Sequence, residues 1–329
     1  MTYSSFLIVL GVAASCAYTS LLYKKRFGRI TPVLALFILG FVLSVFFSRF
    51  LHWYSSSTTY ESLRQALTDF SVGTFCSSGI VIGACLAGAI TGALRICRNK
   101  GALMDCAAPG FALLMVFVRL SAWGTGKCQG GKNITAKAFQ RFPVTVKGTD
   151  AAGNVYYRFA TFMIAAVLFA LAFLLINRFY SKNCTRKMKE PAKRYGNVWN
   201  MMLVLYSAIE IVLDSTRIDS MHFTFRKILT LNRFSTFISI GQIVPFVIFI
   251  CLFVHYVKCS SKADGGFRFK HIACTVIFAV SAFLIGYLGE YKWQRIGSYR
   301  SYLFMTIGSL LIALTIRFLY GQCILKKEE

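Results

Sequence analysis

Six ionisable residues stand out in this chain because they fall within, or at the edge of, segments that are otherwise apolar. They are Asp105, Arg119, Glu210, Asp214, Arg217 and Asp219. An ionisable group at membrane depth is costly, so by default it marks a functional site. The arrangement of these acids and arginines is therefore the starting point for any chemistry that the chain performs.

Two of the acids lie on one face of the same predicted helix, because Glu210 and Asp214 are separated by one helical turn. Two buried carboxylates repel each other unless one is protonated or a cation is near, and Arg119 or Arg217 is the natural partner. Arginine keeps its proton, and its planar fork of donors matches the oxygens of a phosphodiester. The residue types leave two interpretations open: a ligand site for a phosphate group, or a structural salt bridge between two helices.

The elements that must position these residues are apolar helices. The chain is 56% hydrophobic with a mean hydropathy of +0.59, and its apolar residues gather in blocks of about 18–22 residues, the length that crosses a bilayer. The blocks run at 5–23, 30–51, 74–94, 103–123, 156–177, 198–215, 236–257, 271–289 and 301–320. We therefore predict an all-α integral membrane protein with about nine transmembrane helices.

Basic clusters follow the first, third, fifth and seventh blocks and end the chain. By the positive-inside rule these connections are cytoplasmic, so the N-terminus is outside and the C-terminus is in the cytoplasm. The net charge of +25 then reflects topology and attraction to anionic lipid, and we predict no nucleic-acid partner. The polar segment 125–155 is predicted to be an external loop.

Small residues recur every four positions in the third block, at Gly79, Gly83 and Ala87. Such spacing lets helix backbones approach closely, and it would also leave room for a lipid headgroup. The 11 cysteines form no CxxC spacing, and none of the 4 histidines has a partner at metal-ligand spacing. We predict no metal and no cofactor.

The third and fourth blocks resemble the bacterial prolipoprotein diacylglyceryl transferases. The matching stretches are the glycine-rich Ser78–Gly83, Asp105–Pro109 in the order Asp-x-x-Ala-Pro, and Val118–Trp123 around Arg119, with Gly126 and Gly130 where signature glycines would fall. A second stretch is similar to that family's late helix without a gap, through Tyr206, Glu210, Asp214, Arg217 and Asp219, followed by Gly241-Gln242. The resemblance covers residues 1–257, a membrane core of seven spans, and 258–329 would be an additional two-helix extension.

The resemblance implies transfer of a diacylglyceryl group from phosphatidylglycerol, or a related phospholipid, to the lipobox cysteine of a prolipoprotein. The implied partners are that phospholipid and the prolipoprotein signal peptide, and the implied location is the outer face of the bacterial cytoplasmic membrane. It implies catalytic roles for Arg119, Glu210 and Asp214, substrate binding by Tyr3, Ser78, Gly79, Gly126, Gly130, Tyr206 and Arg217, and structural roles for Asp105, Asp219 and Gln242. Arg119 would stabilise the phosphate leaving group, assisted by Arg217, Lys127 or Arg49, and Glu210 or Asp214 would take the thiol proton.

The chain departs from the family pattern at several of these positions. Ser78 stands where the family has His, Ala122 where it has Asn, and Glu210 where it has Arg. A catalytically degenerate homologue that binds lipid or the lipobox peptide is therefore an alternative. A small-solute transporter, with the charges lining an aqueous path, and an assembly factor that docks through the basic segment 178–194 are further alternatives.

Overall fold

Long apolar helices make up most of the part of the chain that the structure describes. The computed structural model describes residues 3–55, 60, 62–69, 75–97, 99–123, 129–130, 133–135, 137–149, 153–185, 195–217, 239–294 and 300–325. In chain order the elements are α1 (Tyr3–Phe27), α2 (Thr31–Ser55), α3 (Leu63–Thr68), α4 (Ser77–Ala93), α5 (Lys100–Leu120), α6 (Lys137–Gln140), β1 (Thr145–Thr149), β2 (Val155–Phe159), α7 (Thr161–Thr185), α8 (Asn197–Thr216), α9 (Ile240–Ala263), α10 (Phe269–Phe283), the π-helix η2 (Leu284–Gln294) and α11 (Arg300–Leu325).

Eight helical segments among the described residues are long and apolar enough to cross a membrane, and α4, with 17 residues, is a shorter apolar helix. A helix rises about 1.5 Å per residue, so 20 residues cover the thickness of a bilayer core. The prediction of an all-α, multi-pass membrane protein is confirmed. The number of crossings and the orientation stay predictions.

The predicted blocks coincide with helices to within a few residues, with one correction. The fifth block was expected to begin at residue 156, but α7 begins at Thr161 because Val155–Phe159 form strand β2. This strand pairs with β1 in antiparallel register, with Thr145 opposite Phe159. The β-branched and aromatic residues of β2 favour a strand, but they are also apolar enough to be assigned to the following helix, which explains the error.

The chain forms two compact units. The first contains the described residues up to Met202 together with Arg217, and the second contains Leu203–Thr216 and the described residues from Ser239 onward. Helix α8 therefore contributes to both. The predicted division at residue 257 falls inside α9, which packs against α11 within the second unit.

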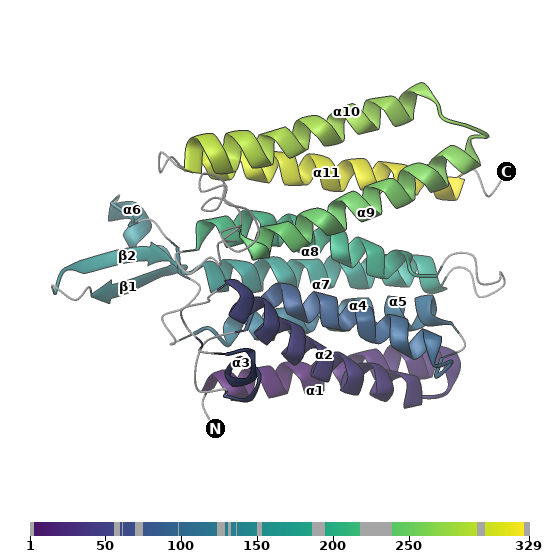
Figure 1. Ribbon diagram of the computed structural model, residues 1–329, viewed down its shortest axis with the longest axis horizontal. Coiled ribbons are helices and arrows are strands. Elements are labelled where there is room, and N and C mark those ends of the chain that lie inside the picture. The colour runs from purple at the N-terminus through teal and green to yellow at the C-terminus, as the bar shows by residue number, and fades with distance from the viewer. Residues whose placement is uncertain are drawn as a thin grey trace. The chain divides into compact units, whose positions relative to one another are not determined.

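In the first unit, α2 packs along α4, α1 along α5, and α5 along α7 (Figure 1). The α2–α4 contact is close because Gly79 and Gly83 lack side chains, and a Cβ at either position would overlap the backbone of Ser48 or Ser44. The α1–α5 contact is closed by a hydrogen bond of 2.5 Å from the Ser15 hydroxyl to the carbonyl of Gly110. The β1–β2 hairpin extends beyond the helix ends of this unit (Figure 1).

In the second unit, α10 and its continuation η2 pack against α11, and α11 also packs against α9 (Figure 1). The turn between α9 and α10 is closed by buried polar contacts. Lys270 Nζ lies 2.6 Å from an Asp264 carboxylate oxygen, and His271 Nε2 lies 3.1 Å from the Ser260 hydroxyl. These contacts satisfy polar groups where the chain reverses direction.

Candidate functional site

A pocket of about 700 Å³ lies within the first unit, between helices α1, α2, α4 and α5. Most of its lining is apolar, including Ile8, Phe37, Phe41 and Phe111, and Trp199 of α8 completes one wall. The hydroxyl groups that line it belong to Ser4, Ser5, Ser15, Ser44, Ser48, Ser77 and Ser121. The pocket is thus a mainly apolar chamber with scattered hydrogen-bonding groups, the usual composition of a small-molecule site.

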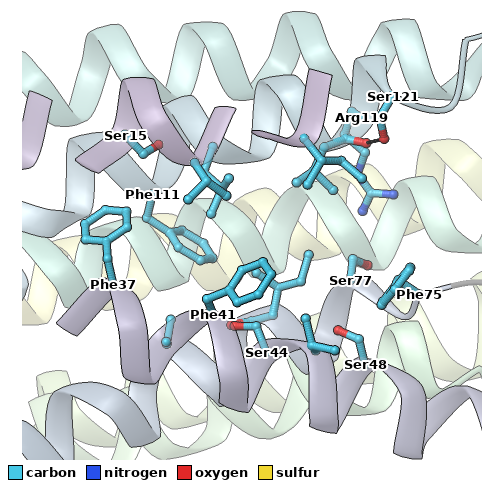
Figure 2. Close-up of a pocket in the computed structure, with 18 of the residues that line it drawn as sticks. Ser15, Phe37, Phe41, Ser44, Ser48, Phe75, Ser77, Phe111, Arg119 and Ser121 are labelled. Carbon is cyan, nitrogen blue, oxygen red and sulfur yellow. Dashed lines mark hydrogen bonds between the residues drawn. The ribbon is translucent and has the colours of Figure 1, made fainter. Parts of the chain in front are cut away.

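The cationic lining of the pocket consists of Arg119 and Arg217 among the described residues. Arg119 is in the last turn of α5, where a cation is favoured by the helix C-terminus, and it is 6% exposed. Figure 2 shows its guanidinium directed into the pocket on the side of Ser77, Ser48 and Phe75, whereas Phe37 lies on the other side. The pocket therefore has a cationic end and an apolar end.

Arg217 follows the end of α8, and its backbone forms an isolated β-bridge with Gly130. The amide of Gly130 in turn donates to the carbonyl of Phe159 at a distance of 2.8 Å. This pairing ties Arg217 to strand β2 through Gly130, so the hairpin of the predicted external loop helps to position the second arginine at the pocket.

Serine residues of α2 form the wall that faces the arginine end. Ser48 is 1% exposed, lines the pocket, and its hydroxyl has no hydrogen-bond partner among the described residues. Ser44, one turn earlier, donates to the carbonyl of Ile80 on α4 at a distance of 3.2 Å. A buried hydroxyl facing a pocket is suited to donate to a ligand oxygen.

Arg49 supports the pocket without lining it. Its Nε donates to the carbonyl of Ala66 at 2.6 Å and its Nη2 to the carbonyl of Asp69 at 2.5 Å. Its guanidinium also lies over the ring of Phe75, 5.5 Å from the centroid, and Phe75 lines the pocket. The short helix α3 is thus held against α2, and Arg49 has a buried structural role.

Asp105 fixes the start of α8, the helix that contributes Trp199 to the pocket. Its carboxylate is buried and accepts hydrogen bonds from the backbone amides of Gly196, Val198 and Trp199, at 2.7, 2.9 and 3.1 Å. Gly196 immediately precedes α8, and Val198 and Trp199 lie in its first turn, where amides have no partner within the helix, so the carboxylate acts as a cap supplied by α5. The indole of Trp199 then packs edge-on against Phe111, with ring centroids 5.3 Å apart.

The acids expected to pair with Arg119 lie in the second unit, and their pairing with arginine stays a prediction. Glu210 is 1% exposed and Asp214 is 3% exposed. The Asp214 carboxylate accepts a hydrogen bond from the hydroxyl of Ser239, the N-cap of α9. None of the described residues that line the pocket is Asp, Glu, His or Cys.

The remaining sequence-predicted residues lie in several places. Tyr3 is 58% exposed at the start of α1, and Tyr206 is buried on α8. Ser78 and Gly79 are buried on α4 beside the lining residue Ser77. Gly126, Lys127 and Asp219 lie outside the described residues.

Most of the pocket wall was not predicted from the sequence, because residues such as Ser48, Phe41 and Phe75 belong to no recognisable motif. Also not predicted was Glu290, a buried acid whose carboxylate accepts a hydrogen bond from the side chain of Gln242. The predicted block ends at residue 289, one residue before Glu290. An acid adjoining an apolar block was the available signal.

The arrangement in the first unit suits an amphipathic anion. The apolar end can hold hydrocarbon chains, while the guanidinium of Arg119, together with Arg217 of the same lining, can hold a phosphate group. A fixed cation at a phosphate also stabilises it as a leaving group. Among the described residues no cluster of His, Cys, Asp or Glu could hold a metal ion.

The model of the prolipoprotein diacylglyceryl transferase family matches residues 1–258, which includes every residue that lines the pocket. A search of curated protein sequences found no match.

Proposed function

Because the chain belongs to the prolipoprotein diacylglyceryl transferase family, we propose that it binds phosphatidylglycerol, or a related phospholipid, in the pocket between α1, α2, α4 and α5 and transfers the diacylglyceryl group to a prolipoprotein cysteine. The observation that carries this proposal is the pairing of a cationic end, at Arg119, with an apolar chamber that Arg217 also lines. A phospholipid has the same two parts, a phosphate and two hydrocarbon chains.

In the proposed reaction the cysteine thiolate attacks the glycerol carbon that bears the phosphate. The carbon–sulfur bond forms as the carbon–oxygen bond to the phosphate breaks, and the phosphate leaves with its headgroup as glycerol phosphate. Arg119 and Arg217 would compensate the negative charge on that leaving group. The thiol must first lose its proton, because the thiolate is the nucleophile.

A base must accept this proton. Glu210 and Asp214 were predicted as bases, and Asp214 is hydrogen-bonded to Ser239 within the second unit. The described lining of the pocket contains no acid or histidine. This composition supports a second candidate function, in which a degenerate homologue binds the phospholipid without turnover.

The two candidates are separated by assaying purified protein in vesicles of phosphatidylglycerol with a lipobox peptide. Mass spectrometry would detect the thioether-linked diacylglyceryl peptide, and lipid retained by the protein in detergent would measure binding. We expect Arg119→Ala to lose transfer about ten- to a hundredfold, the worth of a charge-assisted hydrogen bond. Arg141→Ala is the matched control, since Arg141 is an exposed arginine of the predicted external segment.

Transfer by the wild-type protein and by Arg141→Ala, but not by Arg119→Ala, would support the transferase. Lipid binding that depends on Arg119, with no product from several phospholipid donors and peptides, would support the non-catalytic candidate. A folded wild-type protein that neither binds nor transfers phospholipid would refute both. The same variants can be tested for rescue of a bacterial strain depleted of its own transferase.

A further inference from the structure

The C-terminal helices contribute an acidic side chain, Glu290, that lies beyond the region matched by the family. The family match ends at residue 258, and Glu290 lies on η2 within the candidate membrane span Phe269–Lys292. Glu290 is buried, with only 6% of its surface exposed. An acid in such surroundings is costly unless it is hydrogen-bonded and is seldom retained without a role.

The contacts of Glu290 lead to Gln242, near the start of α9. The side-chain amide nitrogen of Gln242 donates to the Glu290 carboxylate and lies 3.3 Å from the carbonyl of Ile211 on α8. The side-chain oxygen of Gln242 accepts from the backbone amide of Ser239 at 3.2 Å. One side chain thus joins three elements of the second unit: α8, the N-terminus of α9, and η2.

Glu290 acts together with the carbonyl of Ile211 to orient the Gln242 amide, because both groups accept from its nitrogen. A carboxylate accepts hydrogen bonds, so it requires the NH2 group of Gln242 to face it. The amide oxygen is then directed at the backbone of Ser239, which closes the capping box at the start of α9. With the cap closed, the Ser239 hydroxyl accepts from the amide of Gly241 at 2.9 Å and donates to Asp214.

Asp214 is therefore held against the first turn of α9. A Cβ on Gly241 would overlap the Asp214 carboxylate, so glycine is required for this close approach. The exposed amides of a helix N-terminus carry partial positive charge, which favours a carboxylate there. The chain of contacts from Glu290 through Gln242 and Ser239 ends at this carboxylate.

The π-helix η2 is itself held firmly within the second unit. A Cβ on Gly289 would overlap the side chain of Met305, so η2 and α11 are in close contact next to Glu290. The Met305 sulfur accepts a hydrogen bond of 3.0 Å from the hydroxyl of Ser215, the neighbour of Asp214 on α8. Glu290 and Asp214 are thus linked by two sets of contacts. One is the chain of hydrogen bonds through Gln242 and Ser239, and the other runs through Met305 of α11 to Ser215.

We propose that Glu290 is a positioning residue for Asp214, acting through Gln242 and the N-cap of α9. The C-terminal helices are then part of the catalytic machinery, because they supply the acceptor that orders the cap. This inference rests on the proposed function, in which Asp214 is one of the two predicted bases. Glu290 itself need not touch substrate.

The test compares Glu290→Gln with Glu290→Leu in the full-length protein, measuring kcat and KM for transfer. Glutamine keeps an acceptor oxygen at the same reach, so we expect Glu290→Gln to retain at least a third of the wild-type kcat. Leucine removes the acceptor, and we expect a loss of kcat of about tenfold or more with little change in KM, as for a misplaced catalytic group. Tyr287→Leu, at a half-exposed position on the same π-helix, is the matched control and should behave as wild type.

Equal losses in Glu290→Gln and Glu290→Leu would overturn the proposal, because they would show a need for the charge or proton of Glu290. Wild-type kcat in Glu290→Leu would overturn it as well. A merely structural role would lower the melting temperature and leave the kcat of the folded fraction unchanged.

Failure of the proposed function is recognised separately, by an inactive wild-type protein. In that case the link between Glu290 and Gln242 is measured by thermal unfolding of Glu290→Leu, Gln242→Leu and the double variant. We expect the double variant to melt no lower than the worse single variant, because each single change already leaves a buried partner unsatisfied. Additive shifts in melting temperature would overturn the inferred coupling.

Discussion

Replacing Asp105 should destabilise the protein by an amount that can be worked out from its hydrogen bonds. The carboxylate accepts from three backbone amides, with Oδ1 bonded to Val198 and Trp199 and Oδ2 bonded to Gly196. Alanine would leave three amides at the start of α8 without this acceptor, at about 1–3 kcal/mol for each buried donor. We therefore expect a loss of about 3 kcal/mol in the free energy of unfolding for Asp105→Ala, taking the lower limit.

Asparagine at the same position gives a graded version of the test. If its oxygen takes the place of Oδ1, the bonds to Val198 and Trp199 remain and the bond to Gly196 is lost. The expected cost of Asp105→Asn is then about a third of the cost of alanine, or roughly 1 kcal/mol. The order wild type, asparagine, alanine follows from the number of amides that keep an acceptor.

Thermal unfolding of the purified variants in detergent measures this order. A loss of about 3 kcal/mol corresponds to a fall in melting temperature of roughly 6 °C or more in proteins of a few hundred residues. Lipid binding by the fraction that remains folded should fall less than in Arg119→Ala, because Asp105 acts on the pocket only through Trp199 and does not line it. An alanine variant that melts with the wild type, or an asparagine variant that melts below alanine, would refute the capping role.

Two further predictions concern the walls of the pocket. Gly79→Ala should lower the melting temperature, because the added Cβ would overlap the α2 backbone. Gly40→Ala is the control and should be tolerated, because the nearest neighbour lies 3.7 Å from the added Cβ. Equal melting temperatures of the two variants would contradict the close packing of α2 and α4. Arg49→Leu removes two hydrogen bonds to carbonyls in and next to α3. The backbone amides of α3 should then exchange hydrogen about tenfold faster, whereas the amides of α7, the internal control, should exchange at the wild-type rate. Unchanged exchange in α3 would show that Arg49 does not hold it.

The membrane helices could be predicted from sequence because their signal is local. A block of apolar residues long enough to cross a bilayer has to satisfy its own backbone hydrogen bonds, and in a single segment only a helix does so. The predicted start of α7 was wrong because the signal there depends on a contact with another segment. The aromatic residues Tyr156 and Tyr157 suit either an apolar helix or a strand, and pairing with β1 decides between them.

The candidate site could be predicted only in part. Arg119 was found because a guanidinium in an apolar block is costly wherever the helix packs, and it does line the pocket. Ser48 and Phe75 could not be found, since an isolated serine or phenylalanine is ordinary in a membrane helix. Glu290 was missed because it falls one residue beyond the predicted block 271–289, and its hydrogen bond to Gln242 joins residues far apart in sequence.

The sequence by itself determined that the chain is a multi-pass membrane protein of the diacylglyceryl transferase family, with arginine and acids placed in its apolar helices. Only the tertiary structure decided that Arg119 and Arg217 share one pocket, that Asp105 caps α8, and that Glu290 connects to Asp214 through Gln242. Hydrophobicity and helix length depend on residues that are neighbours in the sequence, so they can be predicted from the sequence alone. A hydrogen bond or a pocket wall depends on which residues distant in sequence come within a few ångströms, and helix packing alone sets that.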